Sequence, residues 1–433
     1  MIEDEQMKRL VEMKEELNKC VKCGTCRAIC PTFRILGVES ASARGKMTLI
    51  DAYLKGEITH SDAYLRHLKE CTMCGACKDT CPSGVNTTGL IMAARAEVIE
   101  KQGMSFAASF VMKSLLDPGK LIPVALKFAS RLQGLIMKDA SASSGLIARF
   151  SMPMPTLGGR LIPALAKTFF LDMPEVRRLD RAGKLQDGVL DAKKVAFYAG
   201  CGVNYLMPEV GLASIDVLKR AGAQVTVPGA QVCCGMPAFS MGDVTTAKAM
   251  ALKNLEIFES GDYDYIATSC ATCGQGLKGL FKKLLGNDPK LAARVDDFSK
   301  KVRDITELLV NDLRYKPDGS GKDNAGVTVT YHDPCHLNRA QNIRRQPREL
   351  IAGAKGVTFK EMKHPCSCCG LGGGLSTSNY ELSIEIARRK AESVRDTGAD
   401  VLVTACPGCI VQLRDALHQY GVKAKVAHVV ELL

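Results

Sequence analysis

From residue 195 to the end of the chain, short apolar runs rich in β-branched residues alternate with longer stretches of helical periodicity. The short runs predict six strands, at 195–199, 224–227, 265–268, 327–331, 357–359 and 401–404. Strands that alternate with helices in this way are typical of a parallel sheet covered by helices. We therefore expect the C-terminal half to consist of α/β units.

The same pattern occurs twice in this half. Each copy has a cysteine after its first strand, Cys-Cys-Gly after its second and Cys-x-x-Cys after its third. The two sets are Cys201, Cys233, Cys234, Cys270 and Cys273, and Cys335, Cys368, Cys369, Cys406 and Cys409. Corresponding cysteines are 134 to 136 positions apart, which indicates an internal duplication. Residues 311–326, which are rich in glycine and charged residues, are expected to link the copies.

The cysteines of each copy are expected to converge, because ligands bind beyond the carboxyl ends of the strands in such sheets. The Cys-x-x-Cys pairs also begin helices, whose positive ends favour thiolates. Adjacent cysteines are used more simply on one multinuclear metal cluster than in a strained disulfide. A thioredoxin-like dithiol at Cys406 and Cys409 is the alternative, which the upstream Cys-Cys-Gly sequence disfavours.

Eight further cysteines lie between residues 20 and 81, in two copies of the spacing C-x2-C-x2-C-x3-C-P. Loops with this spacing wrap three thiolates around one [4Fe-4S] cube and send the fourth to the neighbouring cube. The rule assigns Cys20, Cys23, Cys26 and Cys81 to one cluster, and Cys71, Cys74, Cys77 and Cys30 to the other. Paired zinc sites are the alternative, but zinc has no use for the third cysteine step or the trailing proline.

Helical periodicity at 46–54 predicts a helical insertion between these two motifs. Arg44 and Lys46, at its start, are either counter-charges to a cluster or part of a solvated helix end. The formal net charge of the 433 residues is +12, but the basic residues are scattered and no nucleic-acid-binding module is recognisable. We therefore expect no nucleic-acid partner.

Much of the positive charge is expected to compensate the negative charge of cluster thiolates. The cations beside the ferredoxin-type cysteines are the expected counter-charges: Lys19, Lys22, Arg27, Lys69 and Lys78. A chain of this length can fold without disulfides, and its first twenty residues lack the apolar stretch of a secretory signal. The 19 cysteines are therefore expected to serve as metal ligands or redox thiols in the reducing cytoplasm.

Residues 103–190 contain no cysteine and are interpreted as short helices broken at 117–119, Pro123, Pro153, Pro155 and 158–159. Their basic character and large apolar faces suit either a connector packed on the core or a docking surface for a partner subunit or a membrane. No stretch is expected to span a bilayer, because four cations interrupt the most apolar region: Lys113, Lys120, Lys127 and Arg131.

Three features remain after these assignments. Cys366 is a spare ligand or, as we prefer, a redox thiol or a buried residue. His332 and His336 either ligate metal or hydrogen-bond to a cluster, and the second role is favoured because five thiolates already fill the site. The glycine-rich stretch 369–374 does not match a phosphate-binding loop and is interpreted as backbone that approaches a cluster closely.

The combination of two ferredoxin motifs and two five-cysteine modules resembles the iron-sulfur subunits of glycolate oxidase and related D-lactate dehydrogenases. It also resembles the catalytic subunit of heterodisulfide reductases. The likeness covers nearly the whole chain. CVKCGTCRAICPTFRILG, the following ARGKMTLI, and CTMCGACKDTCPSGV look like the glycolate oxidase subunit, whereas YHDPCH, CCGLGGG and TACPGC fit both families.

The resemblance implies a helical two-[4Fe-4S] ferredoxin-type domain at 1–102 and a helical connector or docking region at 103–190. Two duplicated α/β cysteine-rich (CCG) modules are expected at 191–315 and 325–433, with one or two further [4Fe-4S] clusters of cubane or non-cubane type. The whole chain is thus expected to combine α+β and α/β architecture.

The function implied is transfer of electrons from an FAD-containing subunit, which oxidises glycolate or D-lactate, to a quinone or a soluble carrier. FAD would reside only on the partner, which agrees with the absence of a flavin or nicotinamide fingerprint. The chain would be cytoplasmic, with peripheral contact at the inner face of the cell membrane.

Two alternatives stay open. One is a heterodisulfide-reductase-like subunit that cleaves a disulfide at a non-cubane cluster, with the adjacent cysteines Cys233, Cys234, Cys368 and Cys369 as candidate catalytic residues. The other is an electron-transfer subunit for glycerol-3-phosphate or another quinone-linked flavoenzyme.

Overall fold

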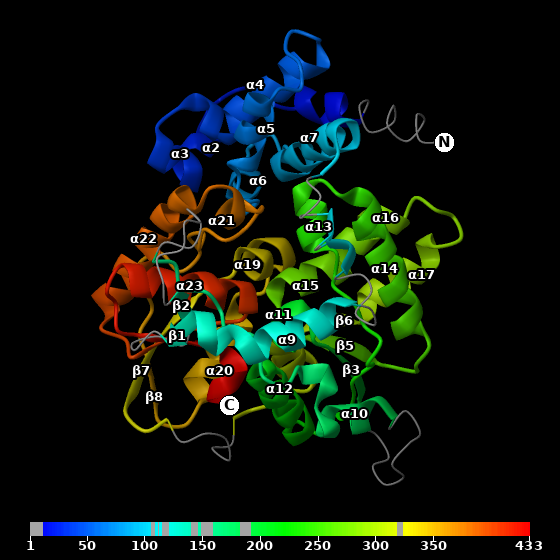
Figure 1. The fold of residues 1–433 in the computed structure, drawn as a ribbon, viewed down its shortest axis with the longest axis vertical. Coiled ribbons are helices and arrows are strands. Elements are labelled where there is room, and N and C mark those ends of the chain that lie inside the picture. Colours follow the sequence, from blue (N-terminus) through cyan, green and yellow to red (C-terminus); the bar gives the residue numbers. More distant parts are fainter. Residues whose placement is uncertain are drawn as a thin grey trace.

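A computed structural model describes residues 12–104, 109–110, 112–114, 121–139, 146–148, 159–181, 192–317 and 324–433. Two α/β units lie next to each other, and a helical N-terminal domain packs against both of them (Figure 1). We call the α/β unit that contains strands β3 to β6 module 1, and the unit that contains β7 to β10 module 2.

The sheets of the two modules have the same topology. Module 1 contains β3 (Lys194–Tyr198), β4 (Gln224–Thr226), β5 (Tyr265–Thr268) and β6 (Val302–Asp304), in the order β4-β3-β5-β6. Module 2 contains β7 (Val327–His332), β8 (Val357–Phe359), β9 (Val401–Thr404) and β10 (Lys425–His428), in the order β8-β7-β9-β10. All neighbouring strands in both sheets are parallel. The predicted α/β duplication is therefore confirmed, although β6 and β10 were not predicted from the sequence.

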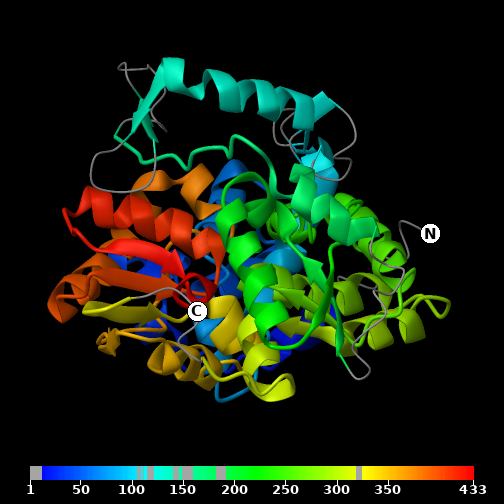
Figure 2. The ribbon, with the colours of Figure 1, turned by 90° about the horizontal axis from the view of Figure 1, so that it is seen from below.

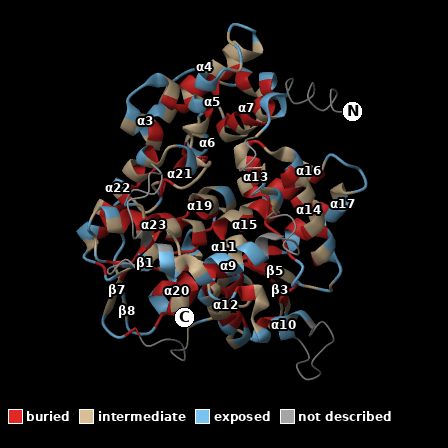
Figure 3. Ribbon diagram, in the orientation of Figure 1, coloured by how far each residue is buried: buried red, intermediate tan, exposed pale blue. Residues whose placement is uncertain are grey.

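Helices cover both sheets. Those of module 1 are α11 (Gly200–Tyr205), α12 (Pro208–Arg220), α13 (Met236–Met241), α14 (Val244–Glu259), α15 (Ala271–Gln275), α16 (Phe281–Leu285), α17 (Ala292–Lys301) and α18 (Ile305–Glu307). Those of module 2 are α19 (Cys335–Gln341), α20 (Arg345–Gly353), α21 (Leu375–Ser378), α22 (Tyr380–Thr397) and α23 (Pro407–Gln419). Buried residues concentrate in the interior of the modules (Figure 3) and form one hydrophobic core that includes side chains from both.

The N-terminal domain is helical, as predicted. After a helix at 12–18 it contains α2 (Thr25–Ile29), α3 (Pro31–Leu36), α4 (Ala43–Leu54), α5 (Asp62–Lys69), α6 (Ala76–Asp79) and α7 (Thr87–Gln102). The helix α4 is the predicted insertion between the two cysteine motifs. Its N-cap is Ser42, whose side chain accepts a hydrogen bond from the backbone N–H of Gly45 at 2.9 Å.

Arg95, a fully buried residue of α7, joins the three units. Its guanidinium donates to the carbonyl oxygens of Leu68 and Cys71 within the N-terminal domain. It also donates to the carbonyl oxygens of Ser240 in module 1 and Gly373 in module 2, at 2.7 and 2.9 Å. The planar fork of the guanidinium suits several acceptors at fixed angles. Arg95 therefore fixes the N-terminal domain against both modules.

The segment between the N-terminal domain and module 1 differs from the short helices predicted there. It contains the 16-residue helix α9 (Leu121–Ile136), the antiparallel pair β1 (Met137–Asp139) and β2 (Leu146–Ala148), and α10 (Pro174–Arg181). Pro123 does not break a helix but lies in the first turn of α9, where its missing N–H leaves no hydrogen bond unmade. The predicted breaks at 117–119, Pro153 and Pro155 lie outside the described residues, as does Gly158 of the pair 158–159.

Helix α9 lies on the outer side of the molecule (Figure 2) and exposes Val124, Phe128 and Leu135. Whether this segment is a connector or a docking surface stays a prediction. Among the described residues, none of the helices has the length and apolar character needed to cross a bilayer. The predicted linker 311–326 starts in a helical turn that ends at Asp312, and its residues 318–323 are outside the described part.

Asp304 ends strand β6 in a fully buried position and caps α18 through the backbone N–H of Thr306. Burial raises the pKa of Asp304 to about 6, so its folded-state pKa exceeds the unfolded-state value. The stability that its protonated form contributes is present at low pH and is lost as the pH rises through about 6.

We therefore expect the free energy of unfolding of Asp304→Asn, taken relative to that of the native chain, to rise by about 1 kcal/mol when the pH is raised from 5 to 7. Thermal unfolding at both pH values measures this difference. Asp297→Asn, a change of an exposed carboxylate, is the control and should show no such trend. A native-to-variant difference for Asp304→Asn that is independent of pH would contradict the expectation.

Candidate metal centres

The eight N-terminal cysteines line two neighbouring cavities. Cys20, Cys23, Cys26 and Cys81 line one cavity. Cys30, Cys71, Cys74 and Cys77 line a second one. Cys77 borders both cavities. These are the two crossed groups that the spacing predicts, brought together by the fold; we call them site 1 and site 2.

Glycines shape the loops around sites 1 and 2. Gly24 and Gly75 have φ values of +86° and +72° and precede the short helices α2 and α6. Glycine adopts this left-handed conformation without the steric cost that a Cβ imposes. The equivalent positions Lys22 and Met73 also have positive φ, at 55° and 54°, so the duplicated motif has the same backbone in both copies.

The buried counter-charges are not the cations predicted from chain proximity. Lys19, Lys22, Arg27 and Lys78 are exposed, and Lys69 is half-buried. Lys46, in contrast, is 1% exposed, borders site 2 and donates to the carbonyl oxygens of Ser40 and Ala41 at 3.1 and 2.6 Å. The solvated interpretation of Lys46 is therefore wrong. Arg44 borders site 1 and pairs with Glu39 at 2.7 Å.

The five cysteines of module 1 gather at the carboxyl ends of its strands; we call them site 3. Cys201 lies in α11 directly after β3, and Cys270 is the N-cap residue of α15 directly after β5. The side chain of Cys201 contacts Cys233, and that of Cys234 contacts Cys273. All are buried except Cys201, which is half-buried beside a small cavity bordered by Tyr205 and Leu171.

The five cysteines of module 2 form the equivalent site 4. The sulfur atoms of Cys369 and Cys409 are 3.7 Å apart, and the backbone N–H of Gly370 donates to the sulfur of Cys368 at 3.3 Å. Cys406 is the N-cap residue of α23 and contacts Cys409. Cys335 begins α19 next to Cys368. The fold thus brings together all ten cysteines of the duplicated sets in two groups of five.

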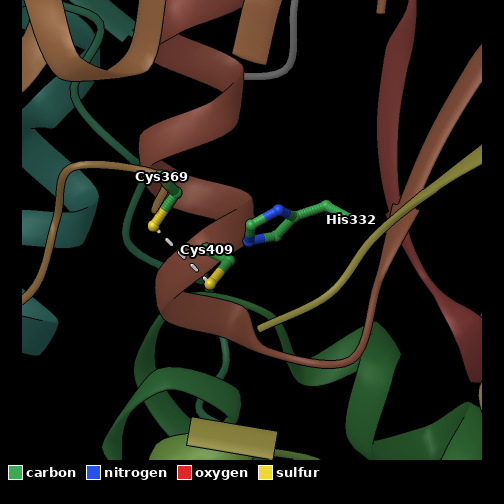
Figure 4. Close-up of side chains that lie close together, drawn as sticks. All are labelled: His332, Cys369 and Cys409. Atoms are coloured by element: carbon green, nitrogen blue, oxygen red, sulfur yellow. Dashed lines mark hydrogen bonds between the residues drawn. The ribbon is translucent and has the colours of Figure 1, made fainter. Parts of the chain in front are cut away.

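His332 adds a nitrogen to site 4. It ends strand β7 in a buried position, and one ring nitrogen faces Cys409 (Figure 4). Its ligating atom and the sulfur atoms of Cys369 and Cys409 all lie within 4.8 Å of one another. Burial, together with the Lys390 ammonium, lowers the pKa of His332 to about 3, so the ring is neutral. Neither ring nitrogen forms a hydrogen bond of standard geometry among the described residues, and the nitrogen that faces Cys409 is placed to interact with a group bound at site 4.

The structure also places His336 and Cys366, the other two residues left over from the ligand sets. His336 shares a hydrogen bond of 3.0 Å with the Thr272 hydroxyl of module 1, so it lies between the modules. Cys366 is exposed, which excludes the interpretation as a buried packing residue.

The glycine of each Cys-Cys-Gly sequence has a specific structural role. Gly235 and Gly370 have φ values of +79° and +97°. A Cβ on Gly235 would lie 3.1 Å from the carbonyl oxygen of Ala247, and one on Gly370 would overlap the carbonyl oxygen of Ser383. The long helices α14 and α22 therefore pack directly against the cysteine loops, which only glycine permits.

The glycine-rich stretch after Cys369 brings module 2 against site 2. A Cβ on Gly372 or Gly373 would overlap the backbone of Thr72 or Cys71. This backbone therefore packs closely against the loop of the N-terminal domain, and its predicted approach to a cluster stays a prediction. Next to it, the side chain of Cys74 contacts that of Cys368, which joins site 2 to site 4.

Sites 3 and 4 also meet. Cys270 of module 1 contacts Cys406 of module 2, and the backbone N–H of Ala271 donates to the carbonyl oxygen of Ala405 at 3.3 Å. Neither this contact nor that of Cys74 with Cys368 was predicted from the sequence. The four cysteine groups therefore form one continuous series, in the order site 1, site 2, site 4 and site 3.

The donor atoms of these sites fit iron-sulfur clusters. Burial raises the pKa values of the Cys71 and Cys335 thiols, so such groups would stay protonated without a bound cation. A bound metal stabilises the thiolate form and removes this cost. Cysteine-lined cavities in the crossed arrangement of sites 1 and 2 are those of a ferredoxin-type domain.

Comparisons with known proteins agree with this class. The model of the 4Fe-4S dicluster domain matches residues 16–85, and that of the cysteine-rich (CCG) domain matches residues 195–278 and 329–414. The chain is 30% identical to the probable glycolate oxidase iron-sulfur subunit of Bacillus subtilis, over 100% of this chain and 98% of that protein. It belongs to the family of CCG-domain iron-sulfur proteins that includes this subunit.

Other relatives show the breadth of the family. A subunit of the fumarate reductase (CoM/CoB) of Methanothermobacter marburgensis is 28% identical over 97% of this chain and 72% of its own length. Lactate utilization protein A of Bacillus cytotoxicus is 35% identical over 55% of this chain and 98% of its own. The crystal structure of a hypothetical protein from Helicobacter pylori has the same fold, with a TM-score of 0.50 and 11% identity, over 97% of this chain and 71% of that one.

The tight packing at Gly370 generates a prediction. Gly370→Ala should destabilise the chain by at least about 3 kcal/mol and should release metal from site 4, because the new methyl group displaces α22 or the cysteine loop. Gly398→Ala is the matched control: Gly398 has φ +63° but open space around it, so only the backbone cost of about 1 kcal/mol applies. Thermal unfolding and metal analysis of both variants test this, and equal effects would contradict it.

Proposed function

We propose that this chain is the iron-sulfur electron-transfer subunit of an FAD-dependent 2-hydroxy-acid dehydrogenase that acts on glycolate or D-lactate. In this proposal, the ten-cysteine duplication and the ferredoxin-type domain hold four [4Fe-4S] clusters, and the flavin belongs to a partner subunit. The observation that carries the proposal is the continuous series of cysteine sites. The full-length similarity to a probable glycolate oxidase iron-sulfur subunit supports the choice of substrate class.

Clusters in these sites would supply one-electron carriers that exchange electrons without a change in covalent structure. Cysteines of this chain connect each site to the next one in the series. Cys77 borders sites 1 and 2, Cys74 contacts Cys368 of site 4, and Cys270 of site 3 contacts Cys406 of site 4. Burial of the four cysteines in the last two contacts excludes water from the path between sites 2, 4 and 3.

Each end of the series is accessible. At site 1, Cys23 is exposed and its neighbour Val21 has 69% of its surface exposed. At site 3, Cys201 is half-buried beside a small cavity that Asn204 and Tyr205 also border. Electrons from a flavoprotein would enter at one end and leave at the other, to a quinone or a soluble carrier. We expect this exchange on the cytoplasmic side, with peripheral membrane contact.

Ligand assignment has a direct test. Cys369→Ser should remove iron from site 4 and leave the spectroscopic signals of the ferredoxin-type clusters, because sites 1 and 2 do not use this residue. Cys366→Ser, an exposed cysteine three positions away, is the control and should keep all iron. Iron analysis and electron paramagnetic resonance (EPR) of the dithionite-reduced variants measure the outcome; unchanged iron in Cys369→Ser would refute the assignment.

The activity is tested on the native complex, purified without oxygen from its source. We expect an FAD protein to co-purify, and glycolate or D-lactate to reduce both an artificial dye and the clusters of this chain. Absence of a flavoprotein, with no cluster reduction by either acid, would contradict the proposal.

A second candidate function is cleavage of a disulfide at a five-cysteine cluster. Two observations favour it: both five-cysteine groups are complete, and a small cavity borders Cys201 at the edge of site 3. Reoxidation of the reduced, isolated chain by a heterodisulfide would support this function over the first.

A further inference from the structure

Buried cations are concentrated around two of the four sites. Three lysine and arginine side chains are buried among the described residues, each at most 1% exposed: Lys46, Arg95 and Lys390. None of the three forms an ion pair with a carboxylate in that part of the chain. Lys46 and Arg95 donate only to carbonyl oxygens, and Lys390 to two carbonyl oxygens and a thioether. The positive charges of these three side chains can therefore interact with the sulfur atoms of nearby cysteines.

These three cations lie beside sites 2 and 4, the two sites that contact each other through Cys74 and Cys368. Lys46 borders the cavity of site 2, and Arg95 donates to the carbonyl oxygen of Cys71 at 3.0 Å. Lys390 lies against the loop of site 4, donating to the carbonyl oxygens of His364 and Pro365, the latter at 2.9 Å. Sites 2 and 4 touch each other through Cys74 and Cys368. The outer sites 1 and 3 have no buried lysine or arginine beside them in the described residues.

The internal duplication supplies a comparison for Lys390. It is the eleventh residue of α22, and Asn254 is the eleventh residue of the equivalent helix α14. The Asn254 side chain donates to the carbonyl oxygen of Cys233 and accepts from the N–H of Val232, at 3.0 and 3.1 Å. Both residues thus hold the loop that leads into Cys-Cys-Gly, but only the residue in module 2 is a cation.

The hydrogen bonds of Lys390 match the charged form of its side chain. Its nitrogen donates to His364, to Pro365 and to the sulfur of Met362, the last at 3.5 Å. Three acceptors match the three N–H groups of an ammonium, whereas a neutral amine has two. A full positive charge in a buried, low-dielectric position interacts strongly with charges a few ångströms away.

Resting on the cluster assignment proposed above, we propose that site 4 is the electron-accepting centre of the duplicated pair. Lys390, a positioning residue that acts through its charge, sets the cluster of site 4 at a more positive reduction potential than that of site 3. An electron delivered by the reduced flavin of the partner therefore rests on site 4 before it passes on. Addition of one electron makes a cluster more negative by one charge, which a nearby cation stabilises. Lys46 and Arg95 act on site 2 in the same direction.

Redox titration of the full-length, anaerobically purified chain, followed by EPR, tests this inference. The signal that Cys369→Ser loses identifies site 4. Lys390→Asn, which copies module 1, should shift the midpoint potential of that signal to a more negative value. Lys390→Arg retains the charge and should keep the potential near that of the native chain. Neither change should move the signals of the other sites by a comparable amount.

The reciprocal variant Asn254→Lys tests the same idea in module 1 without a change at Lys390. It should shift a different signal, that of site 3, to a more positive potential. Iron and sulfide content of each variant shows whether the clusters have assembled, and Lys390→Gln replaces Lys390→Asn if the latter loses iron. The cluster assignment itself would be refuted if the chain without substitutions gave no EPR signal at any potential in the titration. Full iron content with unshifted potentials in the asparagine or glutamine variant, or equal shifts in the arginine variant, would overturn the inference alone.

Discussion

The structure depends on one electrostatic constraint: many thiolate sulfur atoms must be held close together in the interior of a protein. Each thiolate is negative, and burial opposes charge, as the raised pKa values of the Cys71 and Cys335 thiols indicate. A bound metal removes most of this cost, and helix N-termini such as those that follow Cys270 and Cys406 reduce it further. In our proposal, further compensation comes from Lys46, Arg95 and Lys390, buried cations that form no ion pair with a carboxylate among the described residues.

The duplication shows how two equal folds become two different sites. The sheets of modules 1 and 2 have the same strand order, and both use a left-handed glycine to pack a long helix against the cysteine loop. The differences lie in the residues that face the cysteines. The first strand ends at Tyr198 in module 1, whose hydroxyl donates to the carbonyl oxygen of Val232 at 2.6 Å. In module 2 it ends at His332, whose ring nitrogens form no hydrogen bond of standard geometry among the described residues. Lys390 and Asn254 differ in charge. The two copies thus pack a helix against the cysteine loop in the same way, but they differ in the polar and charged residues beside the cysteines.

Much of this arrangement could be predicted because it depends on patterns within short stretches of the sequence. The spacing of the ferredoxin-type cysteines predicted the two groups that line sites 1 and 2, and apolar runs predicted six of the eight strands in the modules. The strands β6 and β10 have only three and four residues, and they form by pairing with β5 and β9, which no local pattern reveals. The hairpin of β1 and β2 was missed for the same reason.

Long-range contacts account for the other failures. Chain proximity suggested exposed cations such as Lys22 and Lys78 as counter-charges, whereas the fold buries Arg95, far from any cysteine in sequence. A lone lysine within an amphipathic helix, as at position 390, resembles an ordinary surface residue until the helix is placed. The contact of Cys74 with Cys368 joins residues almost 300 positions apart and depends on the glycines that let the two loops approach.

We propose that the four cysteine groups hold iron and sulfide and conduct electrons between them. The most direct measurement is iron and acid-labile sulfide analysis of the chain purified without oxygen, combined with EPR before and after dithionite. We expect iron and sulfide in equal amounts, sufficient for clusters in all four sites, and interacting paramagnetic signals after reduction. Colourless protein that contains zinc or disulfides in place of iron, with no signal after dithionite, would contradict it.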